Sequence, residues 1–312
     1  MAHARRFRFG AEMQRPFEGL SWADSARELE ALGYSTLFVP DHFHEGYGPI
    51  TAMATAAMAT TTLKVGPLVF DCDFRHPAVL ARELASIDML SEGRLEIGLG
   101  AGWKQLDYTR SGIPMDPPRV RVDRMIEHTL VLKGLFADEP LTFAGEHYQI
   151  GELDGTPKPY RPGGPPIIIA GGGRRVMRFA GATADIVGVN ASIHSGVADA
   201  AAGRDALPAS IDQKISWLRD GAGDRFDELE INAWLSVAEI TNDAMSIAER
   251  LSSRFGAEPA DVLASPLILV GSEAEIVDHL HARRERWGYS YYVVQGHKVH
   301  EFASIAARLT GA

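Results

Sequence analysis

Along the chain, short apolar runs alternate with segments in which apolar residues recur every three to four positions. The first pattern is typical of buried strands and the second of amphipathic helices. In the first repeat, an apolar run at residues 7–13 precedes Ser21, a good helix N-cap residue. The helix predicted after Ser21 places Trp22, Ala26 and Leu29 on one face. The repeat therefore reads as a strand followed by a helix that packs against it.

The same alternation continues to the end of the chain and predicts eight strands joined by seven helical crossovers. The strands are expected at residues 7–13, 36–39, 63–70, 94–99, 167–170, 185–189, 228–237 and 289–294. A short additional strand is expected at residues 267–270. Eight strands with helical crossovers are the count of a (β/α)₈ barrel, the TIM barrel, rather than of an open sheet.

No Ser/Gly-rich linker or change of composition divides the chain, so we predict a single domain over residues 1–312. Three long inserted loops are expected within it, at residues 103–119, 137–165 and 190–210. Loops of this length in a compact domain usually serve a functional site. In α/β barrels that site lies at the carboxyl ends of the strands, which is where the chemistry is expected here.

Composition excludes several classes of protein. With 31 basic and 41 acidic residues the net charge is −10, and no basic run exceeds a pair, which argues against nucleic-acid binding. No apolar stretch is long enough to span a membrane, and the N-terminus lacks the apolar segment of a signal peptide. The single cysteine, Cys72, excludes an intrachain disulfide. We therefore expect an unprocessed cytoplasmic protein.

The second predicted strand ends at Asp41 and His42. A histidine can donate or accept a proton near neutral pH, so His42 is the leading catalytic candidate, with Asp41 or a backbone carbonyl fixing its tautomer. The alternative is a loop histidine bonded to a carbonyl. His44 follows at a spacing that suits a metal, but the other strand ends supply no further ligands, so we predict no metal site.

Polar residues interrupt the apolar run at the end of the third strand, which predicts a bulge or a strained strand end. The segment reads Val69, Phe70, Asp71, Cys72 and Asp73. We expect Cys72 to be a small buried residue and His76 to cap the next helix.

Glycines follow the fourth strand at Gly98, Gly100 and Gly102. They resemble a dinucleotide fingerprint only superficially, because the complete G-x-G-x-x-G spacing and the following helix and strand are missing. We interpret these glycines as allowing a planar ring to approach, with Trp103 as a wall. The alternative is a tight turn.

A second glycine run, Gly171, Gly172 and Gly173, joins the fifth strand to a helix that begins at Arg174 and Arg175. Free backbone N–H groups at a helix N-terminus, beside two arginines, predict a binding site for an anion such as phosphate. A purely structural turn is the alternative.

Three segments together resemble the bacterial luciferase-like superfamily of flavin- and deazaflavin-dependent enzymes: ELEALGYSTLFVPDHF, FRHPAVLARELASIDMLSEGRLEIGLGAGW and PPIIIAGGG. The resemblance covers nearly the whole chain. Within the superfamily, the chain most resembles the branch that uses coenzyme F420, a deazaflavin with a phosphodiester tail. It implies a cofactor ring resting against a strained, often cis, peptide within Val69, Phe70, Asp71 and Cys72. It places the phosphate at Gly171 to Arg174. It makes His42 the proton donor or acceptor, with Asp41 beside it.

The resemblance implies hydride transfer between F420 and a small organic substrate, either reduction of an enone or imine or the reverse oxidation. An FMN-dependent monooxygenase that uses O₂ is the alternative on the same fold, and a non-catalytic flavin-binding protein is a third. Sugar-phosphate dehydrogenases of the F420 branch carry an acidic residue where this chain has Trp103, so glucose 6-phosphate is not assigned. The family also implies a homodimer, for which the small-residue helix at residues 49–61 is the expected interface.

Overall fold

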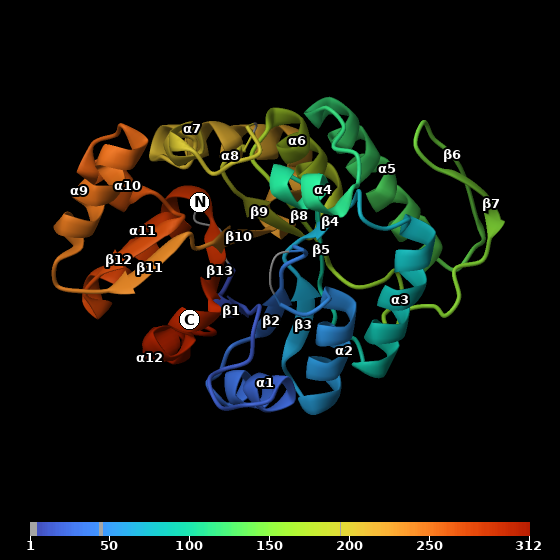
Figure 1. Ribbon diagram of the computed structural model, residues 1–312, viewed down its shortest axis with the longest axis horizontal. Helices are drawn as coiled ribbons and strands as arrows, with labels where there is room; N and C mark the ends of the chain where they lie inside the picture. The colour runs from blue at the N-terminus through green and yellow to red at the C-terminus, as the bar shows by residue number, and fades with distance from the viewer. Residues whose placement is uncertain (1–4, 44–45, 194) are drawn as a thin grey trace. The chain divides into compact units, whose positions relative to one another are not determined.

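The computed structural model describes residues 5–43, 46–193 and 195–312, and Figure 1 shows its helices and strands. The chain separates into two compact units. Unit 1 comprises Met1–Glu12, Ala31–Ser35 and Ile169–Ala312, and unit 2 comprises Met13–Glu30 and Thr36–Ile168. The single domain over residues 1–312 stays a prediction.

Nine strands form one sheet, in the order β3-β2-β1-β13-β10-β9-β8-β5-β4. They are β1 (Arg8–Glu12), β2 (Thr36–Val39), β3 (Lys64–Pro67), β4 (Phe70–Asp71), β5 (Ile97–Gly100), β8 (Ile167–Gly171), β9 (Ile186–Val189), β10 (Glu230–Trp234) and β13 (Tyr289–Gln295). The pairings within each unit are parallel. Within unit 2, Val65 of β3 also bridges Leu95, just before β5, so the strand order returns to its start. The predicted (β/α)₈ fold class is confirmed, with β3 and β4 as two parts of the third strand.

Helices follow the strands as the apolar pattern predicts. They are α1 (Trp22–Ala31), α2 (Pro49–Ala59), α3 (Pro77–Leu90), α5 (Pro118–Phe136), α6 (Arg174–Thr183), α8 (Pro208–Ala222), α11 (Glu273–Trp287) and α12 (Val299–Leu309). Helix α1 buries Trp22, Ala26 and Leu29, the face expected from the sequence. Helix α3 begins at a proline, and the His76 side chain accepts the Ala78 N–H, so His76 is the N-cap that was predicted.

The third predicted strand is interrupted, and the seventh is shorter than expected. A cis peptide bond joins Leu68 to Val69 between β3 and β4. The seventh strand ends as β10 at Trp234, because the Leu235 N–H still bonds within the main sheet whereas the Ser236 N–H bonds to Leu267. The chain then forms β11 (Val237–Ile240), which pairs with β12 (Ile268–Gly271) in a separate two-stranded sheet. This β12 is the additional strand expected at residues 267–270.

Short helices complete unit 1. They are α7 (Ala200–Arg204), α9 (Ala244–Phe255), α10 (Pro259–Ala264) and the 3₁₀ turns η1 (Gly223–Glu228) and η2 (Gly296–Lys298). Ile247 of α9 and Val262 of α10 pack with Ile268 and Val270 of β12 in a small core of their own. Figure 1 shows this group of elements together. Within the part of the chain that the structure describes, no helix has both the length and the apolar character needed to cross a bilayer.

The three long insertions contain regular structure that local patterns did not reveal. Residues 103–119 include α4 (Gln105–Ser111), and residues 190–210 include α7 and the start of α8. Residues 137–165 include an antiparallel hairpin, β6 (Leu141–Ala144) and β7 (Gln149–Leu153), which lies beside α5 in Figure 1. Glu127 of α5 accepts the backbone N–H groups of Glu146, His147 and Tyr148. A tertiary contact therefore holds the hairpin turn.

Candidate active site

His42 lies directly after β2 in unit 2, and a buried carboxylate fixes its ring. The imidazole Nδ1 is 2.5 Å from Oδ2 of Asp107, whose side chain is only 4% exposed, whereas that of His42 is 23% exposed. The other carboxylate oxygen accepts the Phe43 N–H at 3.4 Å. Because Nδ1 is engaged, proton exchange between His42 and a substrate would use Nε2.

The expectation that Asp41 orients His42 is wrong. Both oxygens of Asp41 accept the guanidinium of Arg75, at 2.5 and 2.9 Å, and one of them also accepts the Asp71 N–H at 3.1 Å. Arg75 in turn lies 5.0 Å from the centre of the buried Phe70 ring. Asp41 therefore ties the end of β2 to β4.

Asp107 takes the role that was expected of Asp41. It belongs to α4, inside an insertion that was expected to be a loop, and it lies 65 positions from His42 in the sequence. The sequence signal that could have identified Asp107 is the presence of an acidic residue shortly after the strand-four glycines. Its partner could not be inferred from local pattern, because the contact depends on how distant strand ends meet.

The cis peptide bond at Leu68–Val69 lies at the edge of the segment predicted to support a cofactor ring. The Val69 side chain occupies space that the strand-four glycines leave open. A Cβ atom would lie 2.9 Å from Val69 at Gly98 and 2.6 Å from it at Gly100. These glycines therefore make room for Val69, and contact of Gly100 with a cofactor stays a prediction. Cys72 is buried, as expected.

Tyr108 of α4 links two carboxylates near the end of β4. Its hydroxyl lies 2.7 Å from Asp71 Oδ2 and 2.8 Å from Asp73 Oδ2. Arg124 of α5 donates to the other oxygen of Asp73 at 2.5 Å. Gly102 has a φ of +70°, and a Cβ there would lie 1.9 Å from the Tyr108 hydroxyl, so the network requires glycine at this position. Burial raises the pKa of Asp71 to about 7.

Aromatic side chains flank the imidazole. The Trp103 ring meets His42 edge-on, with 5.9 Å between ring centres, and the Phe43 ring lies 4.9 Å from that of Phe74. Phe43 is 58% exposed although it carries a large apolar ring. Trp103 therefore lies beside the histidine, and its role as a wall for a cofactor ring stays a prediction.

The predicted anion site lies in unit 1, where β8 leads through Gly172 and Gly173 into α6. Gly173 is the N-cap residue and has no side chain to bond the first N–H groups of the helix, and Arg174 is exposed. A Cβ at Gly172 would lie 2.4 Å from the carbonyl oxygen of Asn190, whose N–H bonds to Gly171. The strand, glycine turn and helix N-terminus are thus arranged as expected, and phosphate binding stays a prediction.

Glu12, at the carboxyl end of β1, was not singled out from the sequence. Burial raises its pKa to about 8, so its carboxyl group holds a proton at neutral pH. It pairs in register with Gln295, the last residue of β13. The sequence feature that could have identified Glu12 is an acidic residue at the end of an apolar strand, which is the position where α/β barrels place catalytic groups.

Metal binding has no support among the residues that the structure describes, which contain no cluster of three or more His, Cys, Asp or Glu side chains able to hold an ion. His44, the possible partner of His42 in a metal pair, lies outside the described residues. The absence of a metal stays a prediction.

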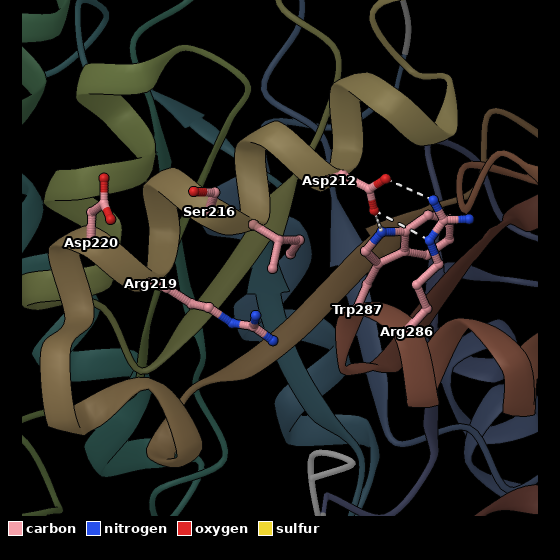
Figure 2. Close-up of a pocket in the computed structure, with 7 residues that line it drawn as sticks. Asp212, Ser216, Arg219, Asp220, Arg286 and Trp287 are labelled. Carbon is pink, nitrogen blue, oxygen red and sulfur yellow. Dashed lines mark hydrogen bonds and ion pairs between the residues drawn. The ribbon is translucent and has the colours of Figure 1, made fainter.

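A surface pocket of about 370 Å³ lies between α8 and the end of α11 in unit 1 and contains none of the predicted site residues (Figure 2). Asp212, one of two acidic residues that line it, accepts hydrogen bonds from the Arg286 guanidinium at 2.7 Å and from the Trp287 indole N–H at 2.6 Å. The Arg286 guanidinium also lies 4.4 Å from the centre of the Trp287 ring. These contacts tie the two helices together, so we assign Asp212 a structural role.

Comparison with known proteins identifies the family. A model of the luciferase-like monooxygenase family matches residues 11–216, about two thirds of the chain. The chain belongs to this family.

Several relatives of this luciferase-like protein carry F420-dependent names. It is 30% identical over 171 residues to an F420-dependent glucose-6-phosphate dehydrogenase of Kineococcus radiotolerans, covering 52% of this chain and 50% of that one. It is 28% identical over 186 residues to a 5,10-methylenetetrahydromethanopterin reductase of Methanolobus tindarius, covering 59% and 54%. The chain thus spans about half the length of these relatives.

Solved structures resemble the luciferase-like chain over nearly its whole length. The F420-dependent tetrahydromethanopterin reductase from Methanopyrus kandleri matches with a TM-score of 0.77 and 17% identity, covering 98% of this chain and 99% of that one. An F420-dependent secondary alcohol dehydrogenase matches with a TM-score of 0.74 and 18% identity, with coverages of 98% and 99%. At these identities the likeness is one of fold.

Proposed function

We propose that the protein transfers a hydride between coenzyme F420 and a small organic substrate. Either the reduced cofactor gives the hydride to an enone or imine, or the oxidised cofactor takes it from an alcohol. The observation that carries the proposal is the imidazole of His42 held at Nδ1 by the buried carboxylate of Asp107. A proton donor or acceptor of fixed orientation is what such a reaction requires besides the hydride carrier. The F420-dependent names of the glucose-6-phosphate dehydrogenases among the relatives support the choice of cofactor.

The residues of this chain suit a cofactor with a phosphodiester tail. A Cβ atom at Gly173 would have open space around it, and Gly173, as the N-cap residue, makes no side-chain hydrogen bond to the first N–H groups of α6, so an anion has room and donors there. Gly171 to Arg174 would hold the phosphate, and the segment from Val69 to Cys72 would support the ring. When bound, a deazaflavin supplies hydride transfer, while the protein supplies placement and a proton.

His42 and Asp107 would perform the proton chemistry. Asp107 holds Nδ1 and stabilises the positive charge of a protonated ring, and Nε2 would be the atom that exchanges a proton with the substrate. Trp103 and Phe43 would exclude water and contact an apolar part of the substrate. The nearby carboxylate of Asp107 would disfavour a strongly anionic substrate group at this position.

Binding and turnover measurements test the proposal. Titration of the purified protein with F420 and, separately, with FMN should show tight binding of F420, and turnover of an enone panel should continue without oxygen. His42→Ala should lower turnover by about 10² to 10⁴ and leave F420 affinity nearly unchanged. His300→Ala, at an exposed position on α12, is the matched control.

Other outcomes would change the assignment. Binding of FMN alone, with turnover that requires oxygen, would favour the monooxygenase alternative on the same fold. Normal turnover of His42→Ala would exclude the proposed proton role, and binding without turnover of any substrate in the panel would favour a non-catalytic flavin-binding protein. A homodimer formed through α2 and a cytoplasmic location stay predictions; sedimentation of the purified protein tests the first.

A further inference from the structure

The Tyr108 hydroxyl lies within hydrogen-bond distance of two carboxyl groups at once, at 2.7 Å from Asp71 and 2.8 Å from Asp73. A phenol carries a single proton, so it can donate to only one of them. If both carboxyl groups were ionised, the second contact would place two acceptor oxygens against each other. Both contacts are satisfied when one carboxyl group is protonated and donates to the phenol oxygen.

The surroundings indicate which group holds the extra proton. Asp73 receives the guanidinium of Arg124 at 2.5 Å, and an adjacent positive charge favours its ionised form. Asp71 instead lies beside carboxylates, because its own N–H bonds to Asp41. Its Oδ1 accepts the Asp73 N–H, and its Oδ2 faces the Tyr108 hydroxyl. If Tyr108 donates to Asp73, these two contacts suit a neutral carboxyl group whose Oδ1 accepts and whose Oδ2 donates.

We propose that Asp71 keeps its proton at neutral pH and donates it to the oxygen of Tyr108, which donates to Asp73. The chain of two hydrogen bonds fixes α4 against the end of β4 and the loop after it. Residue 107, next to Tyr108 on α4, is the carboxylate that orients His42. Asp71 and Tyr108 are therefore positioning residues for the histidine, and this last step depends on the proposed function.

The charged and titratable groups around Asp71 agree with this arrangement. They are Asp41, itself paired with Arg75, then Asp73, paired with Arg124, together with Tyr108 and the buried thiol of Cys72. Burial, and after it the nearby carboxylates, raise the pKa of Asp71 to about 7. As the pH rises through this range, Asp71 loses its proton, and its carboxylate then opposes the Tyr108 oxygen. The contact that holds α4 is therefore expected to weaken above neutral pH.

Two amide substitutions locate the proton. In Asp71→Asn, the amide oxygen can still accept the Asp73 N–H and the amide nitrogen can donate to Tyr108, so this variant imitates protonated Asp71. Its Tm should match that of the parent at about pH 4 and should exceed it by a margin that grows as the pH rises to about 7. Asp73→Asn removes one of the two carboxylates that bind Arg124, the other being Asp116, and should lower Tm throughout the same range. Tyr160→Phe, at an exposed side chain, is the control for loss of a tyrosine hydroxyl.

Infrared spectroscopy of the protein without cofactor detects the proton directly. In a Glu12→Gln background, which removes another carboxyl group expected to stay protonated, the carbonyl band of a protonated carboxyl group should be present near neutral pH. Asp71→Asn should remove the band and Asp73→Asn should retain it. A band that survives Asp71→Asn, or an Asp71→Asn variant as unstable as Asp73→Asn, would overturn the proposal.

The positioning role has its own measurement, which requires no turnover. Tyr108→Phe should move the NMR signals of the His42 ring protons, because the ring environment changes with α4, while Tyr160→Phe leaves them in place. Unchanged His42 ring signals in Tyr108→Phe would refute the link through α4, even with the infrared result intact. Failure of F420 binding or enone reduction would refute the proposed function and leave both measurements of the shared proton valid.

Discussion

Replacement of Glu12 by glutamine is expected to change how the stability of the protein depends on pH. Burial at the end of β1 raises the pKa of Glu12 to about 8 from its ordinary value of 4.5. Between these values the folded protein keeps the proton, whereas the unfolded chain releases it. Glutamine has nearly the same shape, stays neutral at every pH and therefore imitates the protonated side chain.

The sign and size of the effect follow from proton linkage. A carboxyl group with a raised pKa adds stability that is fully present below about pH 4.5 and is lost as the pH rises through about 8. The difference of 8 minus 4.5 corresponds, at about 1.4 kcal/mol per pH unit, to an upper limit of about 5 kcal/mol. Because the Glu12 side chain is partly exposed, solvent screening reduces this, and we expect about 2–3 kcal/mol.

Urea unfolding followed by circular dichroism, at pH steps from about 5 to about 9, measures the effect. The free energy of unfolding of Glu12→Gln should rise relative to that of the parent across this range, because all other titrating groups cancel in the difference. Glu285→Gln, at an exposed position on α11, controls for the loss of a surface carboxylate. A difference between Glu12→Gln and the parent that stays constant from pH 5 to pH 9 would refute the reasoning.

Two further substitutions test the site and the fold. Asp107→Asn removes the charge that orients the imidazole, so turnover should fall by about 10- to 100-fold, which is less than the loss expected when the whole His42 ring is removed. The pH–rate profile should also shift, and an unchanged profile would exclude the pairing of Asp107 with His42. Arg94→Met should lower the free energy of unfolding by at least about 3 kcal/mol in thermal denaturation, because the guanidinium donates to the carbonyl oxygens of Ser91, Leu63 and Ala57 at 2.7–2.8 Å. A Tm close to that of the parent would show that water replaces these bonds.

The barrel could be predicted from the sequence because its signals are local. The apolar period of α1, the proline and histidine at the start of α3 and the β-branched run of β8 each specify their element within about ten residues. The β6–β7 hairpin was missed because its turn is held by Glu127, which lies on α5. Likewise, β10 and β11 are separate strands because the Ser236 N–H bonds to Leu267, just before β12, and not within the main sheet.

In the candidate site too, residues marked by a local sequence pattern could be predicted, and contacts between distant segments could not. His42 and the turn at Gly172 could be found because strand ends carry the chemistry of α/β barrels. The assignment of Asp41 to His42 failed because Arg75, 34 positions later, takes both of its oxygens. Sequence proximity made Asp41 the natural partner, whereas the folded chain brings Asp107 to the histidine.

Helix α4 shows how an insertion can control chemistry at a strand end. A helix of seven residues is marginal by itself, so tertiary contacts must fix its position. Two adjacent residues supply them, since Asp107 reaches His42 after β2 and Tyr108 reaches Asp71 in β4. The orientation of the imidazole therefore depends on the same short helix as the hydrogen bonds at the cis-peptide segment. Substitutions in α4 should consequently alter the proton chemistry of His42 without touching a substrate.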